Sequence, residues 1–300
     1  MNFLEFIDKF QTQDDVIDYF IKIRYKGEVH CHHCGCIGNI YQTANKRLFT
    51  CNNCHNMFSP FTNTIFENTK VDLRKWLYAI HLILNSKKGI SGLQLQREVG
   101  VSYPTAWRIL KKIRIAMGNS GKKDFRDTII EIDETYIGGK PRKHNNKGTE
   151  VKSKRGRGSK KTPVIGVLDR KNKRIHVRVA TENDEGQKLT GKQLLGVLEQ
   201  VADKDDKNIV MTDEFRAYSI LPKVGFDRRT INHQKIFSDG FVHVNNLEGF
   251  WGILKRGIYG IYHHVSVKHL QKYVNEFVFR YENKDNSEAF DVLLNQSIIA

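Results

Sequence analysis

The chain has 300 residues and a mass of 34.8 kDa, a length that suits two domains or one large domain with appendages. Hydrophobic residues make up 39% of it and only five residues are prolines, which excludes a disordered or fibrous protein. The formal net charge of +16 favours a polyanionic partner, so nucleic acid is the first candidate and an anionic membrane surface the second.

The N-terminal residues mix acids with apolar side chains, unlike the basic flank and apolar block of a signal peptide. No apolar run approaches the roughly 18 residues that a membrane span needs. We therefore expect a cytoplasmic protein with no membrane partner. Within residues 1–28, the apolar spacing predicts one amphipathic helix over residues 10–24, with Thr12 as its N-cap.

All five cysteines lie between residues 31 and 54. Four of them form two Cys-x-x-Cys pairs, Cys31/Cys34 and Cys51/Cys54, with sixteen residues between the pairs. This spacing predicts one structural Zn²⁺ ion held by four thiolates, and we assign a zinc ribbon to residues 29–62. Metal-free or redox-active cysteine pairs are the alternative. The remaining thiol, Cys36, is expected to be free, and the side chains that could replace a ligand are His32, His33 and His55.

Residues 68–120 have helical periodicity. Their second half has the pattern of a helix-turn-helix, in which Gly100 permits the turn, Ser102 caps the second helix and Pro104 suits its first turn. The residues expected to pack between the two helices are Leu93, Leu95, Val99, Trp107, Leu110, Ile113 and Met117.

Three cations of the second helix should point away from this apolar seam, at 100° per residue. They are Arg108, Lys111 and Lys112. In a strongly basic chain we expect these side chains to contact DNA, and the alternative is a plain helical hairpin with a solvated basic face.

The pattern changes to that of a sheet over residues 126–284, beginning with a strand at residues 128–136. A hairpin, a helix capped by Thr190, a strand, a short helix, a strand and a longer helix follow. This order is that of the ribonuclease H-like fold, so we predict an α/β domain with a mixed sheet flanked by helices. Residues 138–161 are predicted to form a glycine-rich basic loop, and residues 285–300 a C-terminal tail.

Three carboxylates have informative places in this predicted domain. Asp133 lies near the end of the first strand, Asp213 at the end of a later one and Glu248 early on the last helix. A carboxylate at the end of a buried strand is costly unless it is paired, hydrogen-bonded or bound to a cation. Oxygen ligands favour Mg²⁺ or Mn²⁺, and two such ions about 4 Å apart can support phosphoryl transfer.

Other residues near these acids have competing interpretations. Lys255 shares a helix face with Glu248 and is predicted to contact DNA, although a salt bridge or a solvated lysine is the alternative. Asn245 followed by Glu248 also fits a capping box, which would give the acid a structural role. Trp251 is expected in the core. The acids expected to be ordinary surface residues are Glu134, Asp169 and Glu214.

Four motifs of the sequence resemble those of a known family. In chain order they are EIDETYIGGK, GRGSKKTPVIGVLDR, TDEFRAY and HVNNLEGFWGILKRGIYGIYHHVS. From about residue 10 to residue 281, the chain is similar to insertion-sequence transposases that join an N-terminal zinc ribbon to a DDE catalytic domain. The resemblance implies that Asp133, Asp213 and Glu248 are the catalytic acids and bind two Mg²⁺ ions, with Lys255 as the accompanying basic residue.

Some members of this family have Asn in place of the third acid, and Asn245 and Asn246 lie close to Glu248. The resemblance also implies a reaction. Water would hydrolyse a phosphodiester at the element's end, and the freed 3′-hydroxyl would then attack target DNA. The implied partners are double-stranded DNA, at the element's terminal inverted repeats and at the target, and further copies of the chain in a homo-oligomer on DNA at the nucleoid.

Two other functions would use much of the same sequence. One is a catalytically inactive derivative of a transposase that regulates by binding DNA, and the other is a nuclease that cleaves without joining. The intact set of three acids argues against the first. The second has no need to recognise terminal repeats.

Most of the positive charge falls in two regions. Residues 31–120 carry +9 and residues 140–161 carry another +9, while the rest of the chain is close to neutral. We expect the first region to recognise DNA ends and the second to hold DNA over the acids. The predicted DNA contacts outside the helix-turn-helix are Arg155, Arg157, Lys160, Lys161, Lys255 and Arg256.

Overall fold

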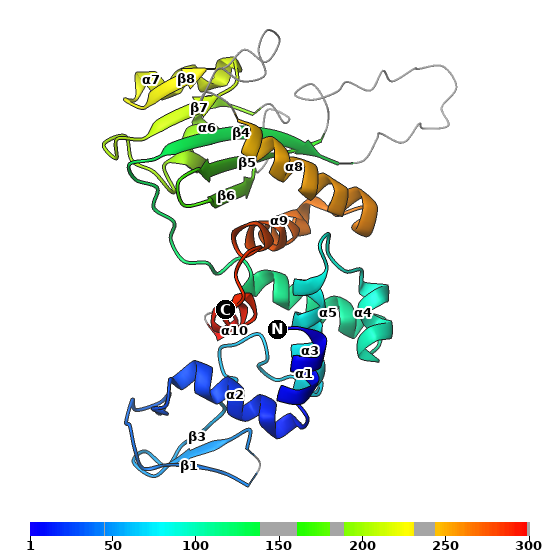
Figure 1. Cartoon of the computed structure of the whole chain (residues 1–300). Helices are drawn as coiled ribbons and strands as arrows, with labels where there is room; N and C mark the ends of the chain where they lie inside the picture. Colours follow the sequence, from blue (N-terminus) through cyan, green and yellow to red (C-terminus); the bar gives the residue numbers. More distant parts are fainter. Residues whose placement is uncertain (45, 139–160, 181–188, 231–243, 299–300) are drawn as a thin grey trace. The chain divides into compact units, whose positions relative to one another are not determined.

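The computed structural model describes residues 1–44, 46–138, 161–180, 189–230 and 244–298 (Figure 1). Within it the chain divides into two compact units. Unit 1 combines Met1–Ser120 with Asn283–Ala300, and unit 2 is Gly121–Glu282. The basic residues Arg155, Arg157 and Lys160 lie outside the described residues.

Unit 1 contains a small antiparallel sheet of order β1-β2-β3 and a group of helices. Helix α2 begins where the sequence predicts, because Thr12 and Asp15 form a capping box at its N-terminus. A shorter helix, α1, precedes it and was not expected. The elements are α1 (Phe3–Lys9), α2 (Gln13–Tyr25), β1 (Ile40–Gln42), β2 (Phe49–Cys51), β3 (Met57–Phe58), α3 (Leu73–Asn85), α4 (Gly92–Val99), α5 (Tyr103–Ala116) and α10 (Ala289–Ile298).

Helices α4 and α5 form the predicted pair. Gly100 ends α4 in the left-handed conformation, with φ 65°, which glycine adopts at little cost. Ser102 is the N-cap position of α5, and a proline lies in its first turn. One predicted core residue is wrong: Leu93 is 56% exposed, because it lies on the face of α4 that turns away from α5. Trp107 is only half-buried.

The residues expected to form a C-terminal tail instead make helix α10, which packs against α2, α3 and α5 within unit 1. Its apolar side chains Phe290, Leu293 and Leu294 are buried. The Phe290 ring stacks on Phe10, with centroids 6.2 Å apart. Unit 1 is therefore built from both ends of the described chain.

Unit 2 contains a five-stranded mixed sheet of order β6-β5-β4-β7-β8. Strands β4, β5 and β6 are antiparallel neighbours, whereas β7 and β8 run parallel to β4. The fold confirms the predicted α/β class and the ribonuclease H-like order of elements. These are β4 (Ile129–Ile137), β5 (Thr162–Asp169), β6 (Arg174–Val179), α6 (Gly191–Leu198), β7 (Ile209–Thr212), a 3₁₀ turn (Arg216–Ser219), α7 (Ile220–Lys223), β8 (Asp227–Thr230), α8 (Asn245–Gly257), a π-helical segment (Ile258–Tyr262) and α9 (Val267–Glu282).

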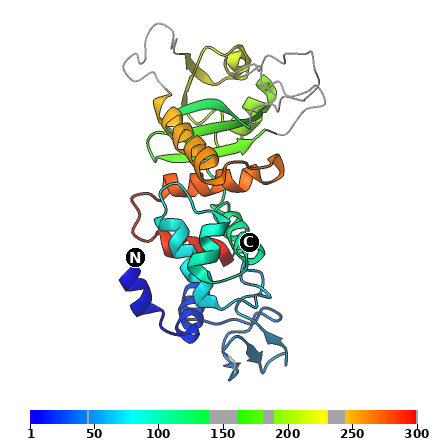
Figure 2. The ribbon, with the colours of Figure 1, turned by 90° about the vertical axis from the view of Figure 1, so that its right-hand side faces the viewer.

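Side chains alternate between two apolar layers along the central strands. Ile132 of β4 and Ile165 of β5 pack in the layer that contains α6. Val164 and Leu168 belong to the layer formed with α8 and α9. Helix α8 lies across this second face of the sheet (Figures 1 and 2). The central strand β4 is therefore covered on both sides, so that the polar side chains of Glu131, Glu134 and Thr135 are buried.

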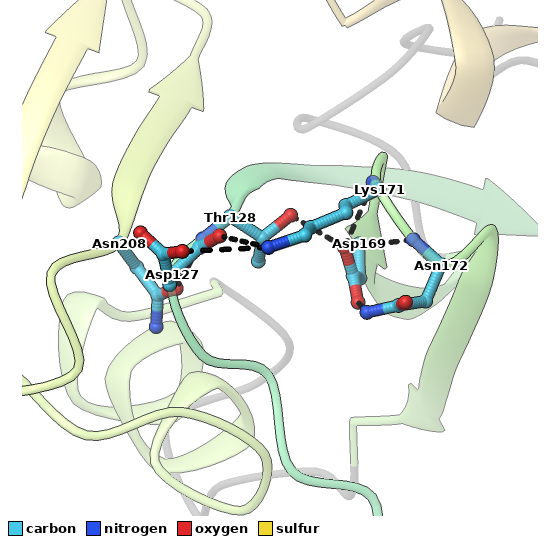
Figure 3. Close-up of polar contacts among 6 residues, drawn as sticks. All are labelled: Asp127, Thr128, Asp169, Lys171, Asn172 and Asn208. Atoms are coloured by element: carbon cyan, nitrogen blue, oxygen red, sulfur yellow. Dashed lines mark hydrogen bonds and ion pairs between the residues drawn. The ribbon is translucent and has the colours of Figure 1, made fainter.

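Asp169, expected at the surface, is fully buried at the end of β5 (Figure 3). Its carboxylate accepts hydrogen bonds from the Thr128 hydroxyl at 2.5 Å, the Lys171 backbone N–H at 3.0 Å and the Asn172 amide at 2.7 Å. Asp169 thereby closes the β5–β6 turn and ties it to the strand beside it. Its role is structural.

The two ends of unit 2 are joined by a buried ion pair. The Lys123 ammonium contacts the Glu282 carboxylate and also donates to the Ile175 carbonyl. The same carboxylate accepts the Ile175 backbone N–H at 2.8 Å. Lys123, near the start of unit 2, and Glu282, at its end, therefore both bond to the backbone of Ile175 in β6. Among the described helices, none has both the length and the apolar character required to cross a bilayer.

Candidate functional site

The four predicted zinc ligands come together in unit 1. The Sγ atoms of Cys31, Cys34, Cys51 and Cys54 all lie within 4.8 Å of one another. The Cys31–Cys54 and Cys34–Cys51 pairs are each 3.7 Å apart. Tetrahedral zinc with Zn–S bonds of 2.3 Å requires sulfur atoms about 3.8 Å apart. The donor set therefore fits one structural Zn²⁺ ion.

Two further residues of this region, His32 and Cys36, have defined contacts. His32 places Nε2 2.8 Å from the Tyr25 hydroxyl and packs its ring on Phe58, and burial lowers its pKa to about 4. His32 is thus used in packing. Cys36 lies next to the predicted zinc ligands, because its Sγ atom is 3.2 Å from that of Cys51.

Two of the predicted catalytic acids meet in unit 2. Strands β4 and β7 are parallel with Glu131 opposite Met211, so continuing this register places Asp213 beside Asp133, just beyond the end of β7. The carboxylates of Asp133, Asp213 and Glu134 offer oxygen atoms within 4.8 Å of one another. Magnesium with Mg–O bonds of about 2.1 Å has ligand oxygens about 3 to 4 Å apart, so this group fits a divalent cation.

Asp133 faces the α8 layer, where it is partly buried. Trp251 of α8 donates its indole N–H to Asp133 Oδ2 at 3.0 Å. Burial, together with the nearby charges of Glu134 and Asp213, raises the pKa of Asp133 to about 7. Carboxylates with a pKa raised by burial and by neighbouring acids are typical of functional sites, and a bound cation would favour the ionised form.

Glu134 is the residue of this site that the sequence analysis missed. It was expected at the surface, but it is only 9% exposed and accepts a hydrogen bond from the buried Tyr218 hydroxyl at 2.8 Å. Burial raises the pKa of Tyr218 well above its ordinary value, so Tyr218 remains a donor. The signal was present in the alternation: Glu134 continues the i, i+2 face of Ile130 and Ile132, which points into the core.

The loop after β7 is held in place by Arg228 of β8. Its guanidinium donates to the Thr212 hydroxyl at 2.8 Å and to the Asp213 carbonyl at 3.0 Å. The Asp213 carboxylate in turn accepts the Phe215 backbone N–H at 2.9 Å. These contacts fix the backbone that carries the second acid.

Helix α8 is anchored at its start by a buried acid that the sequence did not single out. Glu131 is fully buried and accepts hydrogen bonds from Arg170 at 2.6 Å, Asn246 at 2.7 Å and the Leu247 backbone N–H at 3.1 Å. The residue before the helix makes no side-chain cap of its own. The capping-box interpretation of Glu248 is therefore wrong, because a strand residue satisfies the helix terminus instead.

Glu248 and Lys255 both project from α8 within 60° of Trp251, whose indole reaches Asp133. Glu248 is exposed and lies outside the group of three carboxylates, counted over the described residues. Lys255 is half-buried, and burial lowers its pKa while the Asp133 carboxylate opposes this and Lys161 reinforces it. Lys255 therefore lies near Asp133 and Lys161 lies near Lys255, and Arg256 is exposed on the same helix.

The predicted DNA-contacting helix α5 lines a surface hollow of about 550 Å³. Its walls include Tyr103, Trp107, Arg108 and Lys111, with Lys111 Nζ 5.3 Å from the centre of the Trp107 ring. Lys112 is placed differently: it donates to the Ile65 carbonyl at 2.7 Å, inside unit 1.

Comparisons with known proteins agree with this arrangement. The family model for the ISXO2-like transposase domain matches residues 126–282, more than half of the chain, and that for the transposase zinc-ribbon domain matches residues 11–57. A protein described as an uncharacterized protein in transposable element ISH50, from Halobacterium salinarum, is 28% identical over 307 residues, which cover 97% of this chain and 99% of that protein.

Two solved structures of Mos1 transposase assemblies are also similar. The pre-cleavage Mos1 transpososome has 11% identity and a TM-score of 0.28, covering 73% of this chain and 78% of that one. The Mos1 strand transfer complex has 11% identity and a TM-score of 0.24, covering 69% and 76%. The family matches span the cysteine cluster and the acidic cluster, and the chain belongs to the ISXO2-like transposases with an N-terminal zinc ribbon.

Proposed function

We propose that this transposase binds the terminal inverted repeats of an insertion sequence and catalyses metal-dependent strand cleavage and strand transfer. The observation that supports this most is the meeting of Asp133, Glu134 and Asp213 at the open end of β7. Lys255 supplies positive charge beside them. A carboxylate cluster with a flanking cation suits in-line displacement at phosphorus, in which positioning and charge neutralisation provide most of the catalysis.

Each residue has a distinct role in this proposal. Asp133 and Asp213 hold the cations from adjacent strands, and Glu134 adds a third carboxylate from the opposite face of β4. Glu248, exposed in the first turn of α8, is the proposed third family acid. Lys255 would contact a phosphate oxygen. When bound, two Mg²⁺ or Mn²⁺ ions would activate the attacking oxygen and stabilise the leaving oxygen.

The DNA ends would be held by unit 1. Helix α5 presents Arg108 and Lys111 next to two aromatic rings, which suits contact with phosphates and with base or sugar faces. Lys112 is a weaker candidate, because its ammonium group is bonded within the unit. The protein would act on double-stranded DNA at the nucleoid as a homo-oligomer that brings two ends together.

An in vitro assay with labelled element ends, a target duplex and Mg²⁺ tests the proposal. Asp133→Ala or Asp213→Ala should abolish cleavage and strand transfer, with binding to the ends unchanged. Glu214→Ala is the matched control, since Glu214 is an exposed acid next to Asp213 in sequence and should be dispensable. The double variant Arg108→Ala/Lys111→Ala should do the reverse: it should weaken end binding, most strongly at low salt, and make binding less dependent on salt.

The outcomes separate the three candidate functions. Cleavage that survives in Asp133→Ala or Asp213→Ala would contradict the catalytic assignment. A parent protein that binds the ends but never cuts them is the inactive regulator, and one that cuts without joining is a nuclease.

A further inference from the structure

Trp251 combines a core position with a polar contact to the acidic cluster. Its side chain is 4% exposed and lies in the apolar layer between α8 and the sheet, with its ring centroid 5.2 Å from that of Phe250. Its indole N–H nevertheless leaves this layer and donates to Asp133 Oδ2 at 3.0 Å. A buried indole N–H usually finds an acceptor, and here the acceptor is a proposed metal ligand.

We infer that Trp251 is a positioning residue that holds the Asp133 carboxylate ready for a divalent cation, an inference that rests on the proposed function. An indole is suited to this task because it is a donor only. It has no lone pair with which to compete for the cation, and it does not titrate near neutral pH. The hydrogen bond holds one oxygen of the Asp133 carboxylate and leaves the other oxygen for the metal. The carboxylate is therefore already oriented before the metal binds.

Gly166 makes this contact possible. It is the register partner of Asp133 on the neighbouring strand β5. A Cβ atom at Gly166 would lie 2.8 Å from Trp251 Cζ2 and 2.9 Å from Leu247 Cδ2, closer than such atoms approach in folded proteins. The missing side chain therefore allows α8 to lie close to the sheet, so that the indole reaches the next strand.

The same contact fixes the position of α8 relative to the acids. Glu248 precedes Trp251 by three residues and Lys255 follows it by four, so both lie within about one turn of the bonded ring. A hydrogen bond from the middle of the helix to β4 therefore aligns both side chains with the site. Loss of this hydrogen bond should therefore weaken metal binding, and cleavage should weaken only as a consequence.

The test measures Mn²⁺ binding by electron paramagnetic resonance on the full chain without DNA. Trp251→Phe keeps an apolar ring but removes the N–H, and it should weaken Mn²⁺ binding on the order of tenfold, as loss of an outer hydrogen-bond partner of a metal ligand typically does. Half-maximal DNA cleavage should require correspondingly more Mn²⁺, and the rate should recover when Mn²⁺ is raised. Phe250→Leu is the matched control, a core change on the same helix that should lower the melting temperature and leave Mn²⁺ affinity unchanged.

A second replacement removes doubt about folding. Benzothienylalanine at position 251 has the shape of tryptophan with sulfur in place of the N–H, and it should reproduce the weakened Mn²⁺ binding at an unchanged melting temperature. Parent-like Mn²⁺ affinity in both variants would overturn the inference while leaving the proposed function intact. Asp133→Asn separates the two: if it binds Mn²⁺ as tightly as the parent, Asp133 is no ligand and both proposals fail.

Discussion

At the scale of single residues, Asp133 is the most consequential side chain in unit 2. It lies on a strand that is covered on both faces, next to two other carboxylates, and it receives one hydrogen bond from an apolar layer. Its ionised form is therefore disfavoured until a cation arrives. The buried position among other carboxylates suits Asp133 to bind a metal. In the metal-free protein the same position lowers the free energy of unfolding.

This cost has a defined pH dependence. The pKa of Asp133 is raised from 3.8 to about 7 in the folded chain, so the folded state holds a proton that the unfolded state has released. Stability of the protein without added Mg²⁺ should consequently fall as the pH rises from about 4 to about 7. Asp133→Asn removes the ionisation. It should melt at least about 2 °C above the parent at pH 8, the shift that roughly 1 kcal/mol gives in a domain of this size, and close to the parent at pH 4.

Thermal melts followed by circular dichroism, with zinc retained and Mg²⁺ omitted, would measure this difference. The exposed Glu214→Gln serves as the control and should show no gain that depends on pH. A melting temperature for Asp133→Asn at or below that of the parent at pH 8 would show that Asp133 is not destabilised when ionised.

At the scale of elements, the zinc ribbon is the clearest case in which ligands replace a core. Its strands have only two or three residues each, too few to be stable alone. The buried apolar residues around it are few, and two of the cysteines are part of that small core. Binding of zinc should therefore supply most of the folding free energy of this element.

Cys51→Ser tests this directly. The purified variant should hold less than the one zinc ion per chain expected of the parent, and residues 29–62 should become protease-sensitive. Cys36→Ser is the matched control, since Cys36 Sγ lies 3.2 Å from Cys51 Sγ but outside the predicted set of four ligands. Zinc analysis by mass spectrometry distinguishes the two. A Cys36→Ser protein that loses zinc while Cys51→Ser keeps it would show that the ligand set is misassigned.

The elements themselves could be predicted from local patterns. Capping residues at α2 and α6, the left-handed glycine after α4 and the alternation along β6 are each local, and they indicate the type and order of the elements. Contacts across long sequence separations could not be read in this way. Glu131 caps a helix that begins 114 residues later, and the hydrogen bond from Tyr218 to Glu134 joins residues 84 positions apart. Leu93 was misplaced because an apolar residue on a short helix does not reveal which neighbour it faces.

The candidate site divides in the same manner. Asp213 was predictable because it directly follows a recognisable strand, β7. Asp133 was expected near the end of its strand but lies in the middle of β4, because this strand continues to Ile137, and the sheet register brings the two acids together. The roles of Trp251 and Gly166 were not, since each depends on how closely α8 approaches the sheet. Trp251 was expected to be a core residue, which is correct but incomplete.

At the scale of the whole molecule, the division of the chain into two units determines which segments stabilise each other. Unit 1 needs α10, whose buried Phe290, Leu293 and Leu294 lie more than 160 residues after α5 in sequence. Deleting residues 283–300 should therefore destabilise unit 1 by about 4.5 to 9 kcal/mol, from about 1.5 to 3 kcal/mol for each of these three buried side chains. Unit 2 ends at Glu282 and should keep its own unfolding transition.

Differential scanning calorimetry on the protein ending at Glu282 would show this as loss of one transition and retention of the other. Phe290→Ala is a milder variant that should lower the same transition. If unit 1 melts unchanged without α10, its packing against α2, α3 and α5 contributes little.

The order in which the chain is synthesised gives this division a temporal meaning. Unit 2 is complete once Glu282 has left the ribosome, and its Lys123–Glu282 pair can close at once. Unit 1 starts earlier but cannot finish until α10 has also emerged. The unit proposed to bind DNA would thus begin first and be completed last, because its closing helix α10 is the last element of the described chain.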